Sequence, residues 1–386
     1  MWRHWCRQWH GSVLSALCSS RLTVEVLVDR KQPLISRVYA WIVKRKRREE
    51  SSNPQRIAPP QIPVLSVGNV TFGATGKTPF VQFLLDYVLE QTGGGLVPLL
   101  LSRGYCDDEW RMLVKQFPTC DVALGADRVA SGAAKVKELC KTQKVQLSCV
   151  IVDDGLQQWR LAKDLEIVMV DALHPLGNGL ILPCGSLREL PREAFKRADI
   201  VIVHHADLLD GEELKLLMKT LKALVNTERN CIVAASRMKV VGLVSAHTLL
   251  SGEMQEANSD IATPKRRLLL TDKIGAVLCG VGNPKSVIKV VEKVARWAQL
   301  EIKAYPDHHN FTLQDANDII KWVGALQWQR NESVILVTTE KDFARSPNAM
   351  EFLAANADLR VLQCKLELQY NGDKVFERLI STLKLV

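Results

Sequence analysis

Residues 67–80, VGNVTFGATGKTPF, place a glycine-rich loop after an apolar strand pattern and before an amphipathic helix pattern. This is the context that the phosphate-binding loop GxxxxGK[ST] requires, and its register here is TFGATGKT, residues 71–78. Threonine stands at the first glycine position, but Gly73 and Gly76 still allow positive φ where the loop must turn. An ordinary glycine-rich turn is the alternative; the GKT sequence in this context favours a nucleotide site.

A loop of this kind holds phosphate through backbone N–H groups at the start of the following helix. Lys77 is expected to reach the β and γ phosphates, and Thr78 to help hold Mg2+. The predicted nucleotide-binding residues are Gly73, Ala74, Thr75, Gly76, Lys77 and Thr78.

A pair of carboxylates follows another apolar run. In CVIVDDGLQQ, residues 149–158, Asp153 and Asp154 stand where a buried strand is predicted to end. In a parallel sheet this is the carboxyl edge, where a P-loop enzyme places the acid that orients Mg2+. A helix N-cap is the competing interpretation, because aspartate is common there. The neighbouring GKT sequence favours the metal.

Short apolar runs alternate with helical patterns from residue 64 onward. Continuous apolar strands predict a parallel sheet with helices on both faces. The predicted strands of the first block are residues 64–67, 97–101, 149–152, 166–170 and 200–203. The helix after the loop is predicted to bury one face, made of Phe80, Val81, Leu84, Leu85 and Val88.

A second block follows from about residue 275. It predicts a strand over 274–281, a helix over 283–300, and strands over 301–306 and 333–339. Thr312 and Asp315 predict a capping-box start for the helix between the last two strands. The predicted fold class is therefore α/β and two-lobed: a P-loop NTPase-type parallel sheet domain over 61–235, and a smaller α/β/α C-terminal domain over 236–386 that includes the inter-lobe linker.

The N-terminal 60 residues differ from the rest. No acid precedes Glu25 in an arginine- and serine-containing start, which predicts a transit peptide, for mitochondria rather than chloroplasts. The apolar run 33–43 is too short to cross a bilayer, and basic residues follow it. It fits a segment on an anionic membrane surface and, equally, a solvated linker. The predicted division is a transit peptide with a possible surface segment over 1–40 and a basic, proline-rich linker over 41–60.

Composition excludes other classes. Hydrophobic residues make up 47% of the chain and charged residues 24%, as in a folded globular protein. Residues 1–60 hold 12 Lys/Arg and 4 Asp/Glu, which accounts for +8 of the net +9, so a basic body for nucleic acid is not expected. The ten cysteines form no CxxC pair, so neither a zinc site nor a disulfide framework is predicted.

Six motifs in order resemble the tetraacyldisaccharide 4'-kinase family, and together they cover nearly everything from residue 60 onward. They are VGNVTFGATGKTP (67–79), LSRGY (101–105), VDDGLQQWRLAKDLEIVMVDA (152–172), GNGLILPCGSLRE (177–189), YPDHHNFT (305–312) and VTTEKD (337–342). The resemblance implies ATP and Mg2+ as cofactors, and an acylated glucosamine disaccharide 1-phosphate as acceptor of the γ-phosphate at its 4' hydroxyl. It also implies two α/β lobes, an active site in the cleft between them, and work at a membrane surface. The oligomeric state is left open.

The resemblance also implies the site residues. Lys77 becomes a catalytic phosphate ligand, and Thr78 with Asp153 or Asp154 anchors magnesium. A first-position residue other than glycine in the phosphate loop is usual in these kinases.

The family's catalytic aspartate maps best onto Asp108, with Glu109 beside it as a metal ligand and Asp107 as the alternative position. Its histidine partner maps onto His308. An aspartate–histidine pair makes chemical sense, because a sugar hydroxyl is a poor nucleophile until a base accepts its proton.

Several alternatives stay open. His308 has a second interpretation as a residue that caps the following helix. Ala74 and Gln158 depart from the family pattern, which usually has glycine and histidine at these positions. A P-loop switch or GTPase that controls partners is a different class of function, although VTTEKD does not match the spacing of the guanine-reading motif. A degenerate membrane-associated scaffold is the third.

Overall fold

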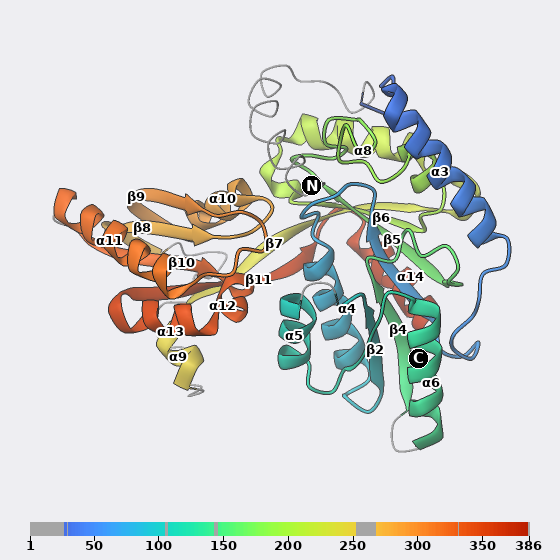
Figure 1. Cartoon of the computed structure of the whole chain (residues 1–386), viewed down its shortest axis with the longest axis horizontal. Helices are drawn as coiled ribbons and strands as arrows, with labels where there is room; N and C mark the ends of the chain where they lie inside the picture. Colours follow the sequence, from blue (N-terminus) through green and yellow to red (C-terminus); the bar gives the residue numbers. More distant parts are fainter. Residues whose placement is uncertain are drawn as a thin grey trace.

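The computed structural model describes residues 27–28, 30–104, 107–142, 146–251, 268–330 and 332–384. Its strands form one eleven-stranded sheet in the order β3-β2-β4-β1-β5-β6-β7-β11-β10-β8-β9. Two lobes are built on this sheet, and the long strands β7 (Ile232–Ser245) and β11 (Asp358–Leu368) join them (Figure 1). The predicted transit peptide lies largely outside the described residues.

The first lobe contains six strands that pair in parallel. Its strands are β1 (Val64–Asn69), β2 (Val97–Ser102), β3 (Asp121–Leu124), β4 (Leu147–Asp153), β5 (Leu165–Asp171) and β6 (Ile200–His204). One face is covered by α4 (Lys77–Gln91), α5 (Asp107–Gln116) and α14 (Gly372–Leu383). The other is covered by α6 (Arg128–Thr142), α7 (Pro191–Phe195) and α8 (Gly211–Leu224). The five strands predicted for this block are confirmed, as is the fully buried apolar face of α4.

The second lobe continues the sheet. It contains the strands β8 (Leu268–Cys279), β9 (Ala295–Ala304) and β10 (Ser333–Thr339), and the helices α9 (Ala246–Ser251), α10 (Pro284–Val294), α11 (Leu313–Arg330), α12 (Glu340–Arg345) and α13 (Pro347–Asn356). β8, β9, β10 and β11 pair in parallel, whereas β11 pairs with β7 in the antiparallel sense. The predicted capping box is confirmed: the Thr312 backbone N–H donates to Asp315, and the Asp315 N–H donates to Thr312 Oγ1.

One predicted element is wrong in part. The helix expected over 283–300 ends at Val294, and residues 295–300 begin β9. Leu268 to Cys279 pair with Ala295 to Ala304 as neighbouring parallel strands, and this ladder satisfies backbone groups that a helix would otherwise satisfy. Short runs of mixed apolar and polar residues fit both the helical and the strand period, so pairing with a distant strand decides which structure forms.

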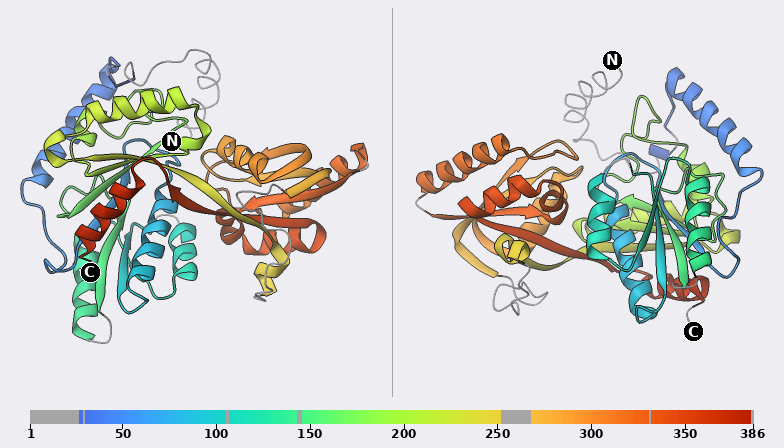
Figure 2. Two further views of the ribbon diagram at one scale, coloured as in Figure 1. Left: turned by 180° about the vertical axis from the view of Figure 1, so that it is seen from behind. Right: turned by 60° about the horizontal axis from the view of Figure 1, so that its bottom comes forward.

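The predicted boundary between residues 235 and 236 falls inside β7, a single strand that runs from one lobe into the other. After the second lobe the chain returns along β11, and α14 packs into the first-lobe core (Figure 2). Val375, Leu379 and Leu383 of this helix are buried beside Leu65 and Phe80. The second lobe is thus inserted between two parts of the first.

Helix α3 (Leu34–Ser51) runs through half of the segment predicted as a linker over 41–60. Five apolar side chains at helical spacing are each more than half exposed, namely Leu34, Ile35, Val38, Trp41 and Ile42. The opposite side is docked on the first lobe: Ser36 is buried and its hydroxyl donates to the Ile181 carbonyl at 2.7 Å, and Arg47 pairs with Glu189 and Glu193. None of the helices in the described ranges is long and apolar enough to span a bilayer.

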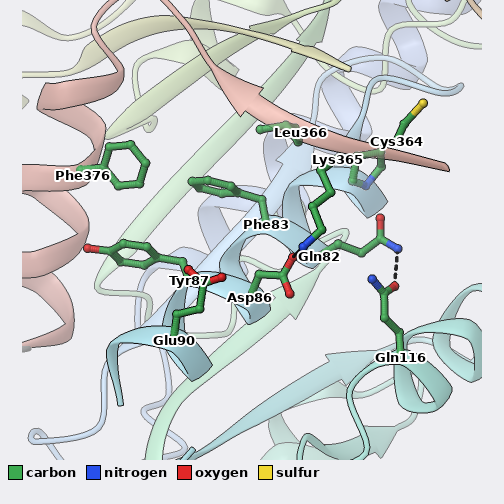
Figure 3. Close-up of a pocket in the computed structure, with 11 residues that line it drawn as sticks. Gln82, Phe83, Asp86, Tyr87, Glu90, Gln116, Cys364, Lys365, Leu366 and Phe376 are labelled. Atoms are coloured by element: carbon green, nitrogen blue, oxygen red, sulfur yellow. Dashed lines mark hydrogen bonds and ion pairs between the residues drawn. The ribbon is translucent and has the colours of Figure 1, made fainter. Parts of the chain in front are cut away.

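Helix α4 is wedged between the sheet and the returning C-terminal segment. Phe83 and Tyr87 of α4 gather around Phe376 of α14, with ring centroids 5.8 Å and 5.4 Å from it (Figure 3). Lys365 of β11 lies 3.4 Å from Asp86. These groups line a pocket of about 210 Å³ on the flank of the helix. Because α4 is held on this side, its N-terminus is fixed at the edge of the sheet, where the glycine-rich loop lies.

Candidate active site

The glycine-rich loop lies between β1 and α4, in the arrangement that the sequence predicts. Backbone φ is +116° at Gly73 and +87° at Gly76, whereas Ala74 has no positive φ. Position 74 therefore needs no glycine for conformational reasons, and this departure from the family pattern leaves the backbone unstrained. Asn69, fully buried at the end of β1, donates from Nδ2 to Thr75 Oγ1 at 2.9 Å and holds the loop from below.

Gly76 is in close contact with a histidine of β6, which is separated from β1 by β5 in the sheet. A Cβ built at Gly76 would lie 2.4 Å from Cδ2 and 2.6 Å from Cγ of His204. The His204 ring is buried, and its Nδ1 lies 2.9 Å from Ser236 Oγ on β7. Burial, with a smaller effect from His205, lowers the pKa of His204 well below its usual range, so the ring is neutral. Gly76 is thus required both by its φ and by this close approach.

Opposite charges gather where β4 ends. Lys77 Nζ lies 3.7 Å from Asp154 Oδ1, and Arg188 Nη1 donates to both carboxylate oxygens of Asp154 at 2.8 and 2.9 Å. Burial acts to raise the pKa of Asp154, but Lys77, Arg188 and Arg128 outweigh it, so the pKa is lowered. Asp154 is therefore a stable carboxylate, and its backbone takes positive φ, +53°.

Arg188 was not among the predicted site residues, although it lies within the quoted motif GNGLILPCGSLRE. Its guanidinium lies over the Phe72 ring, 4.4 Å from the centroid, and also donates to Gln157 Oε1 at 3.1 Å. Gln157 in turn donates to Glu189, the buried acid that binds Arg47 of α3. The sequence signal that could have identified Arg188 is its position directly after a loop rich in glycine and proline.

The donor set fits a nucleotide-bound magnesium ion. Among the described residues, no group of three or more His, Cys, Asp or Glu side chains is placed to hold a metal ion. A magnesium ion on substrate phosphates needs only one or two protein carboxylates, together with hydroxyl and water oxygens. Asp153 is the last residue of β4, and Asp154, which follows it, lies 3.7 Å from Lys77 in the first turn of α4, the turn that also carries Thr78.

The second lobe meets the phosphate loop through the segment that follows β8. A Cβ built at Gly282 would lie 3.1 Å from Ala74 Cβ and 3.0 Å from Asp307 Oδ2. The His308 backbone N–H donates to the Gly280 carbonyl at 3.1 Å, and His308 has φ of +59°. The residues around His308 are therefore tied to the segment that contacts the phosphate loop.

The residue after His308 contacts the start of α11. His309 Nε2 lies 3.2 Å from Asp315 Oδ2, the capping acid of α11, and the His309 ring stacks on Tyr305. The His308 side chain is about one-third exposed, and its Nε2 lies 3.8 Å from Asp307 Oδ2.

Asp342, in the motif VTTEKD, is a structural acid. It is fully buried, and it accepts from the hydroxyl of Thr339, the N-cap residue of α12, at 2.8 Å and from the Gly280 backbone N–H at 3.0 Å. Arg345 Nη1 donates to it at 3.0 Å. Burial raises the pKa of Asp342 although these partners lower it. Asp342 thus holds the segment that bears Gly280 rather than facing a substrate.

The predicted catalytic acids lie in the first turn of α5, which begins at Asp107. The side chains of Asp108 and Glu109 lie outside the described part of the chain, so their roles stay predictions. The helix itself packs against α12 of the second lobe. Helix α5 is therefore at the junction of the two lobes, on the side of the sheet that α4 covers (Figure 1).

The tetraacyldisaccharide-1-P 4'-kinase family model matches residues 32–112 and 106–384. A relative from Arabidopsis thaliana, described as a probable mitochondrial tetraacyldisaccharide 4'-kinase, is 30% identical over 76% of this chain and 74% of its own. The tetraacyldisaccharide 4'-kinase of Anaeromyxobacter dehalogenans strain 2CP-1 is 31% identical over 81% and 79%. A crystal structure of LpxK from Aquifex aeolicus in complex with ATP shares the fold, with a TM-score of 0.54 and 20% identity over 90% of this chain and 97% of that one.

Proposed function

Because this chain belongs to the tetraacyldisaccharide-1-P 4'-kinase family, we propose that it transfers the γ-phosphate of ATP to the 4' hydroxyl of an acylated glucosamine disaccharide 1-phosphate. The observation that carries the proposal is the phosphate loop with Lys77 beside the ionised Asp154, at the sheet edge that the His308 segment of the second lobe approaches. This is the arrangement that a donor site and an acceptor base on opposite lobes would require.

The residues would divide the work as follows. The loop N–H groups and Lys77 bind the phosphates of ATP, and Arg188 keeps Asp154 ionised. Thr78, Asp153 and Asp154 would hold Mg2+, which supplies positive charge against the phosphate oxygens. Asp108 and His308 would accept the proton of the sugar hydroxyl as its oxygen bonds to the γ-phosphorus and ADP leaves. Catalysis would come from positioning and charge neutralisation.

The assay combines the full-length protein, γ-labelled ATP and an acylated disaccharide 1-phosphate in detergent micelles, and detects a 4'-phosphorylated product. Lys77→Ala should fold and lose product formation, because the lysine ammonium that would neutralise the β and γ phosphates of ATP is gone. The exposed Lys219 on α8 offers a matched lysine-to-alanine control, which should keep full activity. A fully active Lys77→Ala protein would contradict the proposed role of the phosphate loop.

The same preparation separates the other classes of function. Strong preference for GTP over ATP without phosphorylation of the acceptor would support a nucleotide switch. A folded protein that binds lipid but shows no ATP-dependent turnover would support a scaffold.

We also propose that the enzyme works at a membrane surface of the mitochondrion. The exposed apolar face of α3 supports the membrane-surface part of this proposal, and the exposed Arg45, Lys46 and Arg48 of the same helix would add attraction to anionic lipid. The acid-poor N-terminal sequence supports the second part, together with the mitochondrial description of the Arabidopsis relative.

A further inference from the structure

A buried hydrogen bond joins the two lobes beside the phosphate loop. Asn283, at the start of α10 in the second lobe, donates from Nδ2 to Asp171 Oδ2 at 3.3 Å. Asp171 is the last residue of β5 in the first lobe. Only 8% of Asn283 and 4% of Asp171 is exposed. A hydrogen bond to a carboxylate shielded from water is stronger and more directional than one at the surface.

The second oxygen of Asp171 is held by the residues that support the phosphate loop. His205 Nδ1 lies 3.0 Å from Asp171 Oδ1, and the His205 ring contacts that of His204, with centroids 4.0 Å apart. His204 is the ring against which Gly76 is pressed. A continuous set of contacts therefore runs from Asn283, through Asp171 and the two histidines, to the loop that precedes Lys77.

The segment around Asn283 also contacts the residues around His308, the candidate base for the acceptor hydroxyl. Gly282, next to Asn283, packs against Ala74 and Asp307. Gly280 accepts the backbone N–H of His308. The position of Asn283 on Asp171 thus sets how the segment around His308 lies relative to the phosphate loop.

We propose that Asn283 and Asp171 are positioning residues, which lock the lobes in the alignment needed for phosphoryl transfer. This inference rests on the proposed kinase function. In this proposal neither residue touches ATP or the acceptor. Each would act by keeping the donor loop and the His308 segment at a fixed separation, and a small misplacement of reacting groups is enough to cost about a hundredfold in rate.

The chain permits a charge-swap test. Asn283 Oδ1 also caps α10 by accepting from the Ser286 N–H at 3.3 Å. Aspartate caps helices as well as asparagine does, so Asn283→Asp keeps the cap but sets two carboxylates against each other. The double variant Asn283→Asp with Asp171→Asn restores one donor and one acceptor, and still offers an oxygen to His205. Asn226→Asp, at the N-cap of the short helix Thr227–Arg229, is the matched control.

We expect Asn283→Asp to lower kcat about tenfold to hundredfold, with KM for ATP changed less than about threefold, because the phosphate loop itself is intact. The double variant should recover most of the loss, and Asn226→Asp should match the parent. If Asn283→Asp keeps the parental kcat, or if its loss persists in the swap, the proposal is overturned. Asn283→Ser keeps a capping oxygen but is too short to reach Asp171; it should reproduce the loss should the aspartate variant fail to fold.

Amide hydrogen exchange separates this inference from the kinase proposal. Exchange of the His308 N–H, which depends on the 280–283 segment, should speed up about tenfold in Asn283→Asp and return toward the parental rate in the swap. A parent that phosphorylates no acceptor would refute the proposed function, while unchanged exchange in the single variant would refute the lock.

Discussion

Replacing Gly76 by alanine tests the tight fit between the phosphate loop and β6. The new Cβ would lie 2.4 Å from Cδ2 of His204, whose ring is buried and held by Ser236, so the ring has little room to move. Forcing an extra group into a packed interior costs about 1–3 kcal/mol. The φ of +87° adds a left-handed penalty of about 1–2 kcal/mol for a residue with a Cβ. The free energy of unfolding should therefore fall by about 2–5 kcal/mol.

Gly73→Ala isolates the backbone part of this cost. Gly73 has φ of +116°, but no atom lies within 4 Å of its built Cβ, so only the backbone penalty of about 1–2 kcal/mol applies. Urea unfolding of both variants, combined with ATP binding by titration calorimetry, gives the comparison. A double-mutant cycle of Gly76→Ala with His204→Ala should show a favourable coupling of about 1–3 kcal/mol, because removal of the ring relieves the clash.

Two results would refute this reasoning. One is that Gly76→Ala is no more destabilising than Gly73→Ala within about 0.5 kcal/mol, the usual error of additivity. The other is a coupling with His204 that is zero within the same error. Either would mean that the loop moves away from β6 without cost, and that the close approach does not constrain it.

Two further predictions concern Asp154 and α3. The pKa of Asp154 is lowered from its ordinary value of 3.8, because the nearby cations outweigh the effect of burial. The ionised Asp154 therefore stabilises the folded protein above pH 3.8, and this stabilisation is lost as the pH falls through the lowered pKa. The difference in unfolding free energy between parent and Asp154→Asn should be constant above about pH 5 and shrink below 3.8 in urea titrations; a difference that persists at lower pH would contradict the assignment. Trp41→Asp should weaken flotation with anionic vesicles at least tenfold and leave turnover of detergent-dispersed acceptor unchanged. Leu216→Asp, on the exposed side of α8, should leave both flotation and turnover at the parental level. Equal flotation of the two variants would contradict a role for α3 in membrane binding.

Local sequence patterns were sufficient to predict the regular strands, the amphipathic helix after the loop and one helix cap. Five buried parallel strands, the apolar face of α4 and the capping box at Thr312 follow from periodicity and cap chemistry. The helix over 283–300 was wrong because its last third pairs with β8, and no local signal reports a distant strand. The return of α14 to the first core was missed for the same reason.

Some residues of the candidate site were predictable from local sequence, and others were not. Lys77 was predicted from the phosphate-loop motif, and Asp153 or Asp154 from the end of an apolar strand; Lys77 and Asp154 lie 3.7 Å apart. Arg188, Asn283 and Asp171 were not singled out, since each lies in a different segment and has meaning only once the sheet edge brings the segments together. A lone arginine, asparagine or aspartate in a loop carries no spacing signature, so contact in three dimensions is what identifies it.

The late position of α14 in the chain has a consequence for synthesis on the ribosome. Part of one apolar face of the first-lobe sheet stays uncovered until residues 372–383 have left the exit tunnel, although strands β1 to β6 are translated before the second lobe. A nascent chain is therefore exposed to chaperones and to aggregation throughout translation of the inserted second lobe. Loss of residues 372–383 would therefore uncover the core against which α4, the helix that begins at Lys77, is packed, although the two segments lie far apart in the sequence.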